Sequence, residues 1–303
     1  MLDILMRAGS FIAIIVMGYL LKRIGFFKQE DFSVLSKIVI RITLPCAIVT
    51  SFAGKVIDPA LLSLAFIAVS CGIAYITIAL FINRNHSREQ KAFEMLNLAG
   101  YNIGTFVIPF AQSFLGTLGV IAVSLFDTGN AVICLGGSYS LAAMVKDGNG
   151  FSVKRIITAL VCSVPFMTYM IMLLVNLLHF RVPSFIMSFA GMGANANAFM
   201  AMLMIGVGFK LELGDRRQVS TIAKLLSIRY SMATVFALIF YFLLPFALEV
   251  RQALVILAFS PIGSAVPGFT EQLKGDVGLS SALNSFAMVI SITITVVLLL
   301  VML

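Results

Sequence analysis

Charged residues are scarce in this chain of 303 residues: only 11% are charged, whereas 60% are hydrophobic and the mean hydropathy is +1.06. A soluble domain carries roughly 25% charged residues. A water-soluble fold would have to cover its surface with polar side chains that this sequence does not have. The scarcity of charge therefore predicts an integral membrane protein.

The residues that build metal, redox and nucleotide sites are also scarce. The two histidines, His86 and His179, are far apart in sequence, and no Gly-x-x-x-x-Gly-Lys-[Ser/Thr] phosphate loop is present. The cysteines stand singly in apolar runs, without a Cys-x-x-Cys pair, and we interpret them as small buried side chains: Cys46, Cys71, Cys134 and Cys162. These absences predict no catalytic residues, no metal site and no cofactor. We therefore expect that the chain is not an enzyme.

What the sequence does contain is a series of long apolar runs. A membrane-spanning helix needs about 20 apolar residues. In the longest run, Met95–Val145, Asp127 is the only formal charge, and Gly116–Gly119 offers a turn that divides the run in two. Reading the runs against the charged breaks predicts ten spans, near 4–21, 33–53, 59–82, 95–115, 118–142, 156–178, 183–208, 226–247, 252–270 and 277–302.

The basic residues of the short connections predict the orientation of these spans, because lysine and arginine concentrate on the cytoplasmic side. The odd-numbered connections hold fourteen: Lys22, Arg23, Lys28, Arg84, Arg88, Lys91, Lys146, Lys154, Arg155, Lys210, Arg216, Arg217, Lys224 and Lys274. The opposite side holds four: Arg7, Lys55, Arg181 and Arg251. Both termini are therefore expected on the non-cytoplasmic side. The net charge of +8 is explained by topology, and no nucleic-acid partner is expected.

Ten spans divide into two sets of five, residues 1–145 and 150–303. Because five is odd, the second set enters the membrane from the opposite side, which gives an inverted repeat, a common transporter architecture. The fourth and ninth spans support this division, because Asn102–Phe110 and Pro261–Phe269 share four positions without a gap: Ile103/Ile262, Gly104/Gly263, Val107/Val266 and Phe110/Phe269.

Proline and glycine in these two segments favour broken helices, because proline lacks a backbone donor and glycine tolerates non-helical angles. Unwound backbone at membrane depth is tolerated only where it lines a cavity or is buried in protein. The alternative is a pair of ordinary proline kinks, with Gly100 and Gly104 as a small-residue packing face.

Several segments resemble the auxin efflux carrier family, including its bacterial members of the malonate and organic-acid permease type. The segments are Gly18–Phe27 with Asp31 and Leu35–Lys37, Thr43–Cys46, the Asn102/Pro109 element, and Ser260–Gly263. The resemblance covers the whole chain in length, span count and order of motifs.

The resemblance implies an all-α fold of ten transmembrane helices in two inverted five-helix repeats, whose fourth and ninth helices are broken and cross. Helices 1, 2, 6 and 7 would form a scaffold domain and helices 3–5 and 8–10 a transport domain. It also implies a secondary carrier of small organic anions, with elevator-like movement, in the bacterial inner membrane. A homodimer through the scaffold domain is compatible with this arrangement.

Polar and helix-breaking residues of the two broken spans are the candidate substrate site. Asn102 matches the family position whose asparagine binds a substrate carboxylate, and its buried amide would otherwise cap the helix or bind a neighbour. Hydroxyls at the crossing either contact ligand or bond back to their own helix. The candidate residues are Asn102, Gly104, Thr105, Pro109, Ser260, Pro261, Ser264 and Pro267.

Asp127 is the candidate for ion coupling, because a carboxyl at mid-membrane depth is costly and commonly functional. Asn130 lies almost one turn further on the same helix face and is expected to share the site. We expect coupling to H⁺ in preference to Na⁺, while a structural pair between Asp127 and Arg41 is the alternative. In the seventh span, Asn195 and Asn197 are expected to form hydrogen bonds between helices.

Three other functions remain as alternatives to an anion carrier. An exporter of the drug/metabolite type also has ten spans, but it has cytoplasmic termini and lacks paired broken helices. A channel and a non-transporting receptor are the other two. The sequence leaves the substrate, the direction of transport, the coupling ion and the oligomeric state open.

Overall fold

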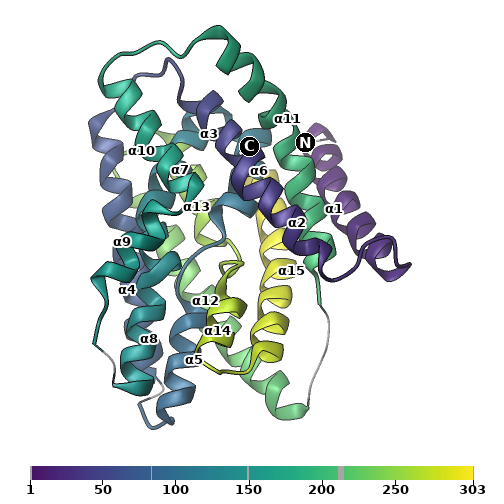
Figure 1. Ribbon diagram of the computed structural model, residues 1–303, viewed down its shortest axis with the longest axis vertical. Coiled ribbons are helices and arrows are strands. Elements are labelled where there is room, and N and C mark those ends of the chain that lie inside the picture. Colours follow the sequence, from purple (N-terminus) through teal and green to yellow (C-terminus); the bar gives the residue numbers. More distant parts are fainter. Residues whose placement is uncertain (1, 83, 149, 211–214, 303) are drawn as a thin grey trace.

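The computed structural model describes residues 2–82, 84–148, 150–210 and 215–302, and every regular element in these ranges is helical (Figure 1). The first half contains α1 (Leu2–Arg23), α2 (Asp31–Ile38), η1 (Val39–Thr43), α3 (Leu44–Phe52), η2 (Pro59–Leu62), α4 (Ser63–Ile82), α5 (Arg88–Leu98), η3 (Ile103–Val107), α6 (Ile108–Phe114), α7 (Gly116–Val132), η4 (Ile133–Gly137) and α8 (Ser138–Asp147). The second half contains α9 (Val153–Val161), α10 (Val164–Leu177), α11 (Ser184–Gly208), α12 (Arg216–Phe242), α13 (Leu248–Ala258), α14 (Val266–Gln272) and α15 (Val277–Met302).

Among the described residues, 7 helical stretches are long and apolar enough to cross a membrane, or 8 when one bent pair counts as a single span. The 7 are Ile4–Arg23, Asp31–Phe52, Pro59–Ile82, Gly116–Asp147, Ser184–Gly208, Gln218–Phe242 and Val277–Met302. The protein is thus an all-helical, multi-pass membrane protein. The remaining two expected spans, 95–115 and 252–270, do not reach the required length because each is interrupted.

The sixth expected span, near 156–178, is bent, a feature that the sequence analysis did not predict. Helices α9 and α10 meet at 75°. The hydroxyl of Ser163 accepts a hydrogen bond from the backbone N–H of Phe166, and Pro165 stands in the first turn of α10. A serine cap followed by proline begins a new helix, so the chain turns here.

Three π-helical turns are present in the described residues: η1 and η4 lie inside longer helices, whereas η3 opens the helical stretch that continues as α6. Two of them end shortly before a proline, η1 before Pro45 and η3 before Pro109. A proline inside a helix cannot donate to the preceding turn and its ring crowds that turn. A wider turn relieves this crowding, which explains the position of η1 and η3.

One group of helices packs around α11, which contacts α1, α2 and α3, while α10 packs on α3. Small residues allow close approach of α1 and α11: a Cβ added at Gly206 would lie 2.1 Å from the carbonyl oxygen of Ile15. Asn197 is fully buried and links three helical elements, because it accepts from Thr43 at 2.9 Å and donates to Gln112 at 3.0 Å. The expected interhelical bonds are therefore present at Asn197, whereas Asn195 is exposed.

A second group packs around α7, which contacts α4, α6 and α13; α12 packs on α13, α5 on α8, and α14 on α15. A buried polar cluster joins three of these elements. The hydroxyl of Ser280 in α15 donates to the side-chain oxygen of Asn97 in α5 at 2.7 Å, and the Asn97 amide lies 3.5 Å from the hydroxyl of Thr270 in α14. Such bonds fix the two interrupted segments relative to α15.

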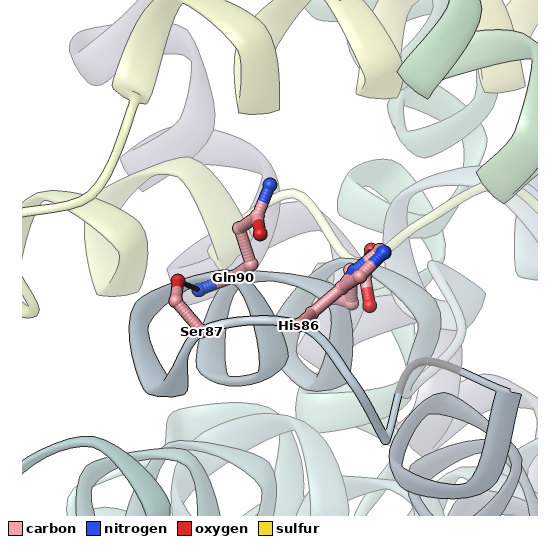
Figure 2. Close-up of polar contacts among 4 residues, drawn as sticks. His86, Ser87 and Gln90 are labelled. Atoms are coloured by element: carbon pink, nitrogen blue, oxygen red, sulfur yellow. Dashed lines mark hydrogen bonds and ion pairs between the residues drawn. The ribbon is translucent and has the colours of Figure 1, made fainter.

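The start of α5 is capped by Ser87, whose hydroxyl accepts from the backbone N–H of Gln90 at 3.3 Å (Figure 2). The neighbouring His86 lies 3.1 Å from a carboxylate oxygen of Glu94. The labels N and C both stand in the upper part of Figure 1.

Candidate substrate site at the two helix interruptions

The fourth and ninth expected spans are both interrupted, as the sequence predicted, although the first break precedes the segment Asn102–Phe110, which is helical from Ile103 onward. Helix α5 ends at Leu98, and helical structure resumes at Ile103; α13 ends at Ala258, and α14 begins at Val266. Gly100 lies between helices with φ +82°, a conformation that glycine adopts without strain. The alternative of Gly100 and Gly104 as a packing face of one continuous helix is therefore wrong.

The two interruptions touch each other. The backbone N–H of Asn102 donates to the carbonyl oxygen of Pro261 at 2.9 Å. Both also lie against Cys134, since a Cβ added at Gly100 or at Gly263 would lie 2.3 Å or 3.5 Å from its sulfur. We call residues 99–102 and 259–265 together the junction.

The side chain of Asn102 is buried at the junction and only half satisfied. Its oxygen accepts a hydrogen bond from the Thr105 hydroxyl at 2.5 Å, and its amide nitrogen has no partner among the residues that the structure describes. The residue is 5% exposed. Because a buried polar group without a partner costs about 1–3 kcal/mol, this donor is available for a ligand.

Two cavities flank the junction, one of about 570 Å³ and one of about 150 Å³, and Asn102, Ser264 and Ala265 line both. The larger cavity has both apolar and polar side chains on its wall, and the polar ones beyond the junction are Gln29, Ser33, Lys210, Glu271, Ser281, Asn284 and Ser285. The smaller cavity contains Asp127, Asn130, Cys134 and Tyr169. Asn102 thus stands between two compartments of different character.

Asp127 in the smaller cavity is held by two hydrogen bonds. The Asn130 amide donates to one carboxylate oxygen at 2.9 Å and the Tyr169 hydroxyl to the other at 3.0 Å. Asn130 also accepts from the backbone N–H of Tyr101 and donates to its carbonyl, both at 3.0 Å. The pair Asp127 and Asn130 is therefore connected to the first interruption. Arg41 is exposed and forms no ion pair with Asp127 in the described ranges.

The other candidate residues divide into three kinds of position. Gly104 and Thr105 line the smaller cavity, and Pro267 lines the larger one. Pro109 and Ser260 are buried and line neither cavity. Pro261 contributes its carbonyl to the junction. Some of the predicted site residues therefore line the cavities next to Asn102, whereas Pro109 and Ser260 are buried away from both cavities.

Sequence reasoning missed Arg229, the largest fully buried side chain in the described residues, which is 1% exposed and belongs to α12. Its guanidinium donates to the carbonyls of Leu98, Gly100, Ser260 and Pro261, at 2.7, 3.0, 3.0 and 3.1 Å. It also lies over the rings of Tyr75 and Tyr101, at 5.4 and 5.5 Å from their centroids. A lone arginine inside the apolar run 226–247 was the signal that could have identified it.

Comparison with known proteins points to transport. Residues 4–150 match a family described as membrane transport proteins, which agrees with the resemblance to auxin efflux carriers. An uncharacterized transporter of Methanothermobacter thermautotrophicus is 26% identical over 210 residues, or 67% of this chain. The aligned part spans 66% of that relative's length. Both matches are to transport proteins and not to enzymes, as the sequence predicted.

Proposed function

We propose that this protein is a secondary carrier of small organic anions, such as carboxylates, and that the anion binds at the junction. The observation that carries the proposal is the amide nitrogen of Asn102, which has no hydrogen-bond partner in the described ranges, on a residue that lines both cavities. A carboxylate oxygen accepts from such a donor in a charge-assisted hydrogen bond.

The electrostatics of the junction favour a negatively charged ligand. Arg229 places a full positive charge behind the two interruptions, and it shares the Pro261 carbonyl with the backbone N–H of Asn102. The continuous helical stretch from Ile103 to Phe114 begins directly after Asn102. The positive end of its dipole therefore lies on the side from which an anion would bind.

The architecture proposed for this activity has ten crossings, formed by residues 1–145 and 150–303 as two inverted repeats. The group around α11 is the scaffold and the group around α7 is the transport domain. Gln29, Lys210 and Glu271 line the larger cavity and lie in or next to connections expected to be cytoplasmic. In the elevator-like cycle, movement of the second group would carry Asn102 from this side to the other.

Counterflow in proteoliposomes tests the activity. Vesicles preloaded with one unlabelled carboxylate are given the labelled compound outside, for a panel of mono- and dicarboxylates. We expect transient, saturable accumulation for at least one class of carboxylate, and its loss in Asn102→Ala. Asn195→Ala is the matched control, because the same substitution is made at an exposed position on α11. Linear, non-saturable flux without accumulation would identify a channel instead.

Reporter fusions test the proposed topology. A reporter that is active only outside the cytoplasm is fused to the C-terminus, and a reporter active only inside is fused in parallel. We expect activity from the first reporter alone. A cytoplasmic C-terminus would remove the ten-crossing model and would favour the drug/metabolite type of exporter.

A further inference from the structure

Arg229 is a buried cation whose guanidinium, in the described residues, forms its hydrogen bonds with backbone carbonyls and lies over two aromatic rings. In the described parts of the chain no carboxylate forms an ion pair with it. Two of its acceptors are at the first interruption: Leu98 is the last residue of α5, and Gly100 lies in the interruption itself. The other two, Ser260 and Pro261, belong to the second. One side chain therefore holds both interruptions together.

The four carbonyls have the chemistry of a cation site. They lie at the carboxyl ends of α5 and α13, where unsatisfied carbonyls carry the negative end of the helix dipole. In broken-helix transporters such unwound carbonyls commonly hold Na⁺. Here the planar guanidinium, with its five donors, takes these oxygens. A metal ion on the same oxygens would lie next to a fixed positive charge and would be repelled.

We propose that Arg229 is a tethered cation that takes the place of a bound alkali-metal ion at the junction. It cancels the negative ends of α5 and α13 permanently, and it keeps the surroundings of Asn102 electropositive without sodium. The part of this inference that concerns transport rests on the proposed anion carrier. The part that concerns cation binding rests on the geometry of Arg229 alone.

If this inference is right, a protein without the Arg229 side chain should bind a small cation in its place. Arg229→Ala leaves a space bordered by four carbonyls and by the rings of Tyr75 and Tyr101, which together suit a free guanidinium ion. Arg251→Ala is the matched control. Arg251 also donates to a backbone carbonyl, that of Tyr241 at 2.9 Å, and its guanidinium lies 5.7 Å from the centroid of the Tyr241 ring. Arg251 is outside the junction.

The first experiment measures the apparent unfolding temperature of the purified full-length protein in detergent, with guanidinium, sodium or choline chloride added at millimolar concentration. We expect Arg229→Ala to unfold at a lower temperature and to recover saturably with guanidinium, whereas Arg251→Ala does not respond. Absence of recovery with any of these cations in a folded Arg229→Ala protein would overturn the inference.

If Arg229→Ala does not fold, the same measurement on the wild-type protein still tests the inference. Sodium should give it no more stabilisation than choline does, and a saturable stabilisation by sodium would overturn the inference. Arg229→Lys keeps the charge with fewer donors. We expect it to fold with a lower unfolding temperature than the wild type and to remain insensitive to sodium; a sodium response of this variant would count against the tethered cation.

The second experiment measures counterflow with sodium replaced by choline. We expect an unchanged wild-type rate, and a raised half-saturating carboxylate concentration in Arg229→Lys. Sodium-dependent counterflow of the wild type would overturn the inference. If the wild type exchanges no carboxylate at all, the proposed function fails, and the stability experiment still decides whether Arg229 occupies a cation site.

Discussion

The two interrupted segments meet at one place, yet the chain is broken differently in each. The first interruption is short, and a π-helical turn follows Asn102 at once. The second stays unwound from residue 259 to 265. The first contributes a side-chain donor, the amide of Asn102, and the second contributes the carbonyl of Pro261 that anchors it. Similar sequence segments can therefore take complementary parts in one site.

The reason for the difference lies in the residues that precede the shared Ile-Gly pair. Gly100 ends α5 with a positive φ, which turns the chain within a few residues. In the second segment Pro261 follows Ser260, and a residue before proline is driven to extended backbone. An extended stretch exposes its carbonyls, and those of Ser260 and Pro261 accept from Arg229.

The largest effect is expected for Gly100→Ala compared with Gly263→Ala. An alanine at φ +82° costs about 1–2 kcal/mol, and its Cβ would lie 2.3 Å from the Cys134 sulfur, which adds about 1–3 kcal/mol of overpacking. At Gly263 the contact would be 3.5 Å, which is ordinary, so little change is expected. Unfolding temperatures in detergent check this. Equal destabilisation of the two variants would mean that the two breaks are equally constrained.

The next largest effect is expected for Asn102→Ala compared with Ser264→Ala. Loss of a charge-assisted hydrogen bond costs about 1.5–3 kcal/mol, or roughly ten- to a hundredfold in carboxylate affinity. Ser264 lines the same cavities but is only half-buried, whereas Asn102 is buried, so a smaller loss is expected. Binding of the transported carboxylate to the purified, folded proteins is the measurement. Full affinity in Asn102→Ala would contradict the proposed contact.

Particular residues show how far the sequence could predict this site. The paired Gly/Pro segments predicted which two spans are broken, although the first break lies just before its segment, and the polarity of Asn102 and Asp127 in apolar surroundings marked them as candidates. Hydropathy alone treated Arg229 as part of a span. Its role depends on carbonyls from two segments, Leu98–Gly100 and Ser260–Pro261, whose meeting is a tertiary fact. The same holds for Tyr169, which reaches Asp127 from α10.

A third prediction concerns the cavity behind the first interruption. When the site is dry, a neutral carboxyl at Asp127 avoids much of the cost of a buried charge, about 2.5–3.5 kcal/mol for an aspartate at a helix centre. When water enters, ionisation becomes favourable and the proton leaves, which would couple proton movement to transport. We expect an imposed proton gradient, and not a sodium gradient, to drive uptake by the wild type in proteoliposomes. Asp127→Asn should lose this response.

Two further variants test whether the gradient response depends specifically on Asp127. Tyr169→Phe removes one of the two donors to Asp127 and should weaken the gradient response without abolishing it. Asn195→Ala should leave it unchanged, because Asn195 is exposed on α11. If wild-type uptake ignores both gradients and Asp127→Asn transports normally, Asp127 is a structural residue that holds Asn130 and Tyr169 in place.

The smallest effect is expected for Pro267→Ala. Comparing this variant with Pro109→Ala again distinguishes the second interruption from the first. Both prolines follow a break, but Pro109 lies inside the continuous helical stretch that begins at Ile103, whereas Pro267 is the second residue of α14. A proline in the first turn of a helix lacks only an N–H that would have no intrahelical partner. Its replacement should therefore cost about 0.4–1 kcal/mol, chiefly through the greater freedom of the unfolded chain.

Pro109→Ala should behave differently, because it allows the π-helical turn η3 to tighten into a regular α-helix. Tightening would rotate Asn102 away from the shared wall of the two cavities and should reduce counterflow more than it reduces the unfolding temperature. Pro267→Ala should keep counterflow close to the wild-type rate. The measurement is the counterflow rate normalised to folded protein, with the unfolding temperature of each variant determined in parallel. If Pro267→Ala abolishes counterflow as completely as Pro109→Ala, the proline ring in the wall of the larger cavity is itself required, and the two interruptions are more alike in function than their backbones indicate.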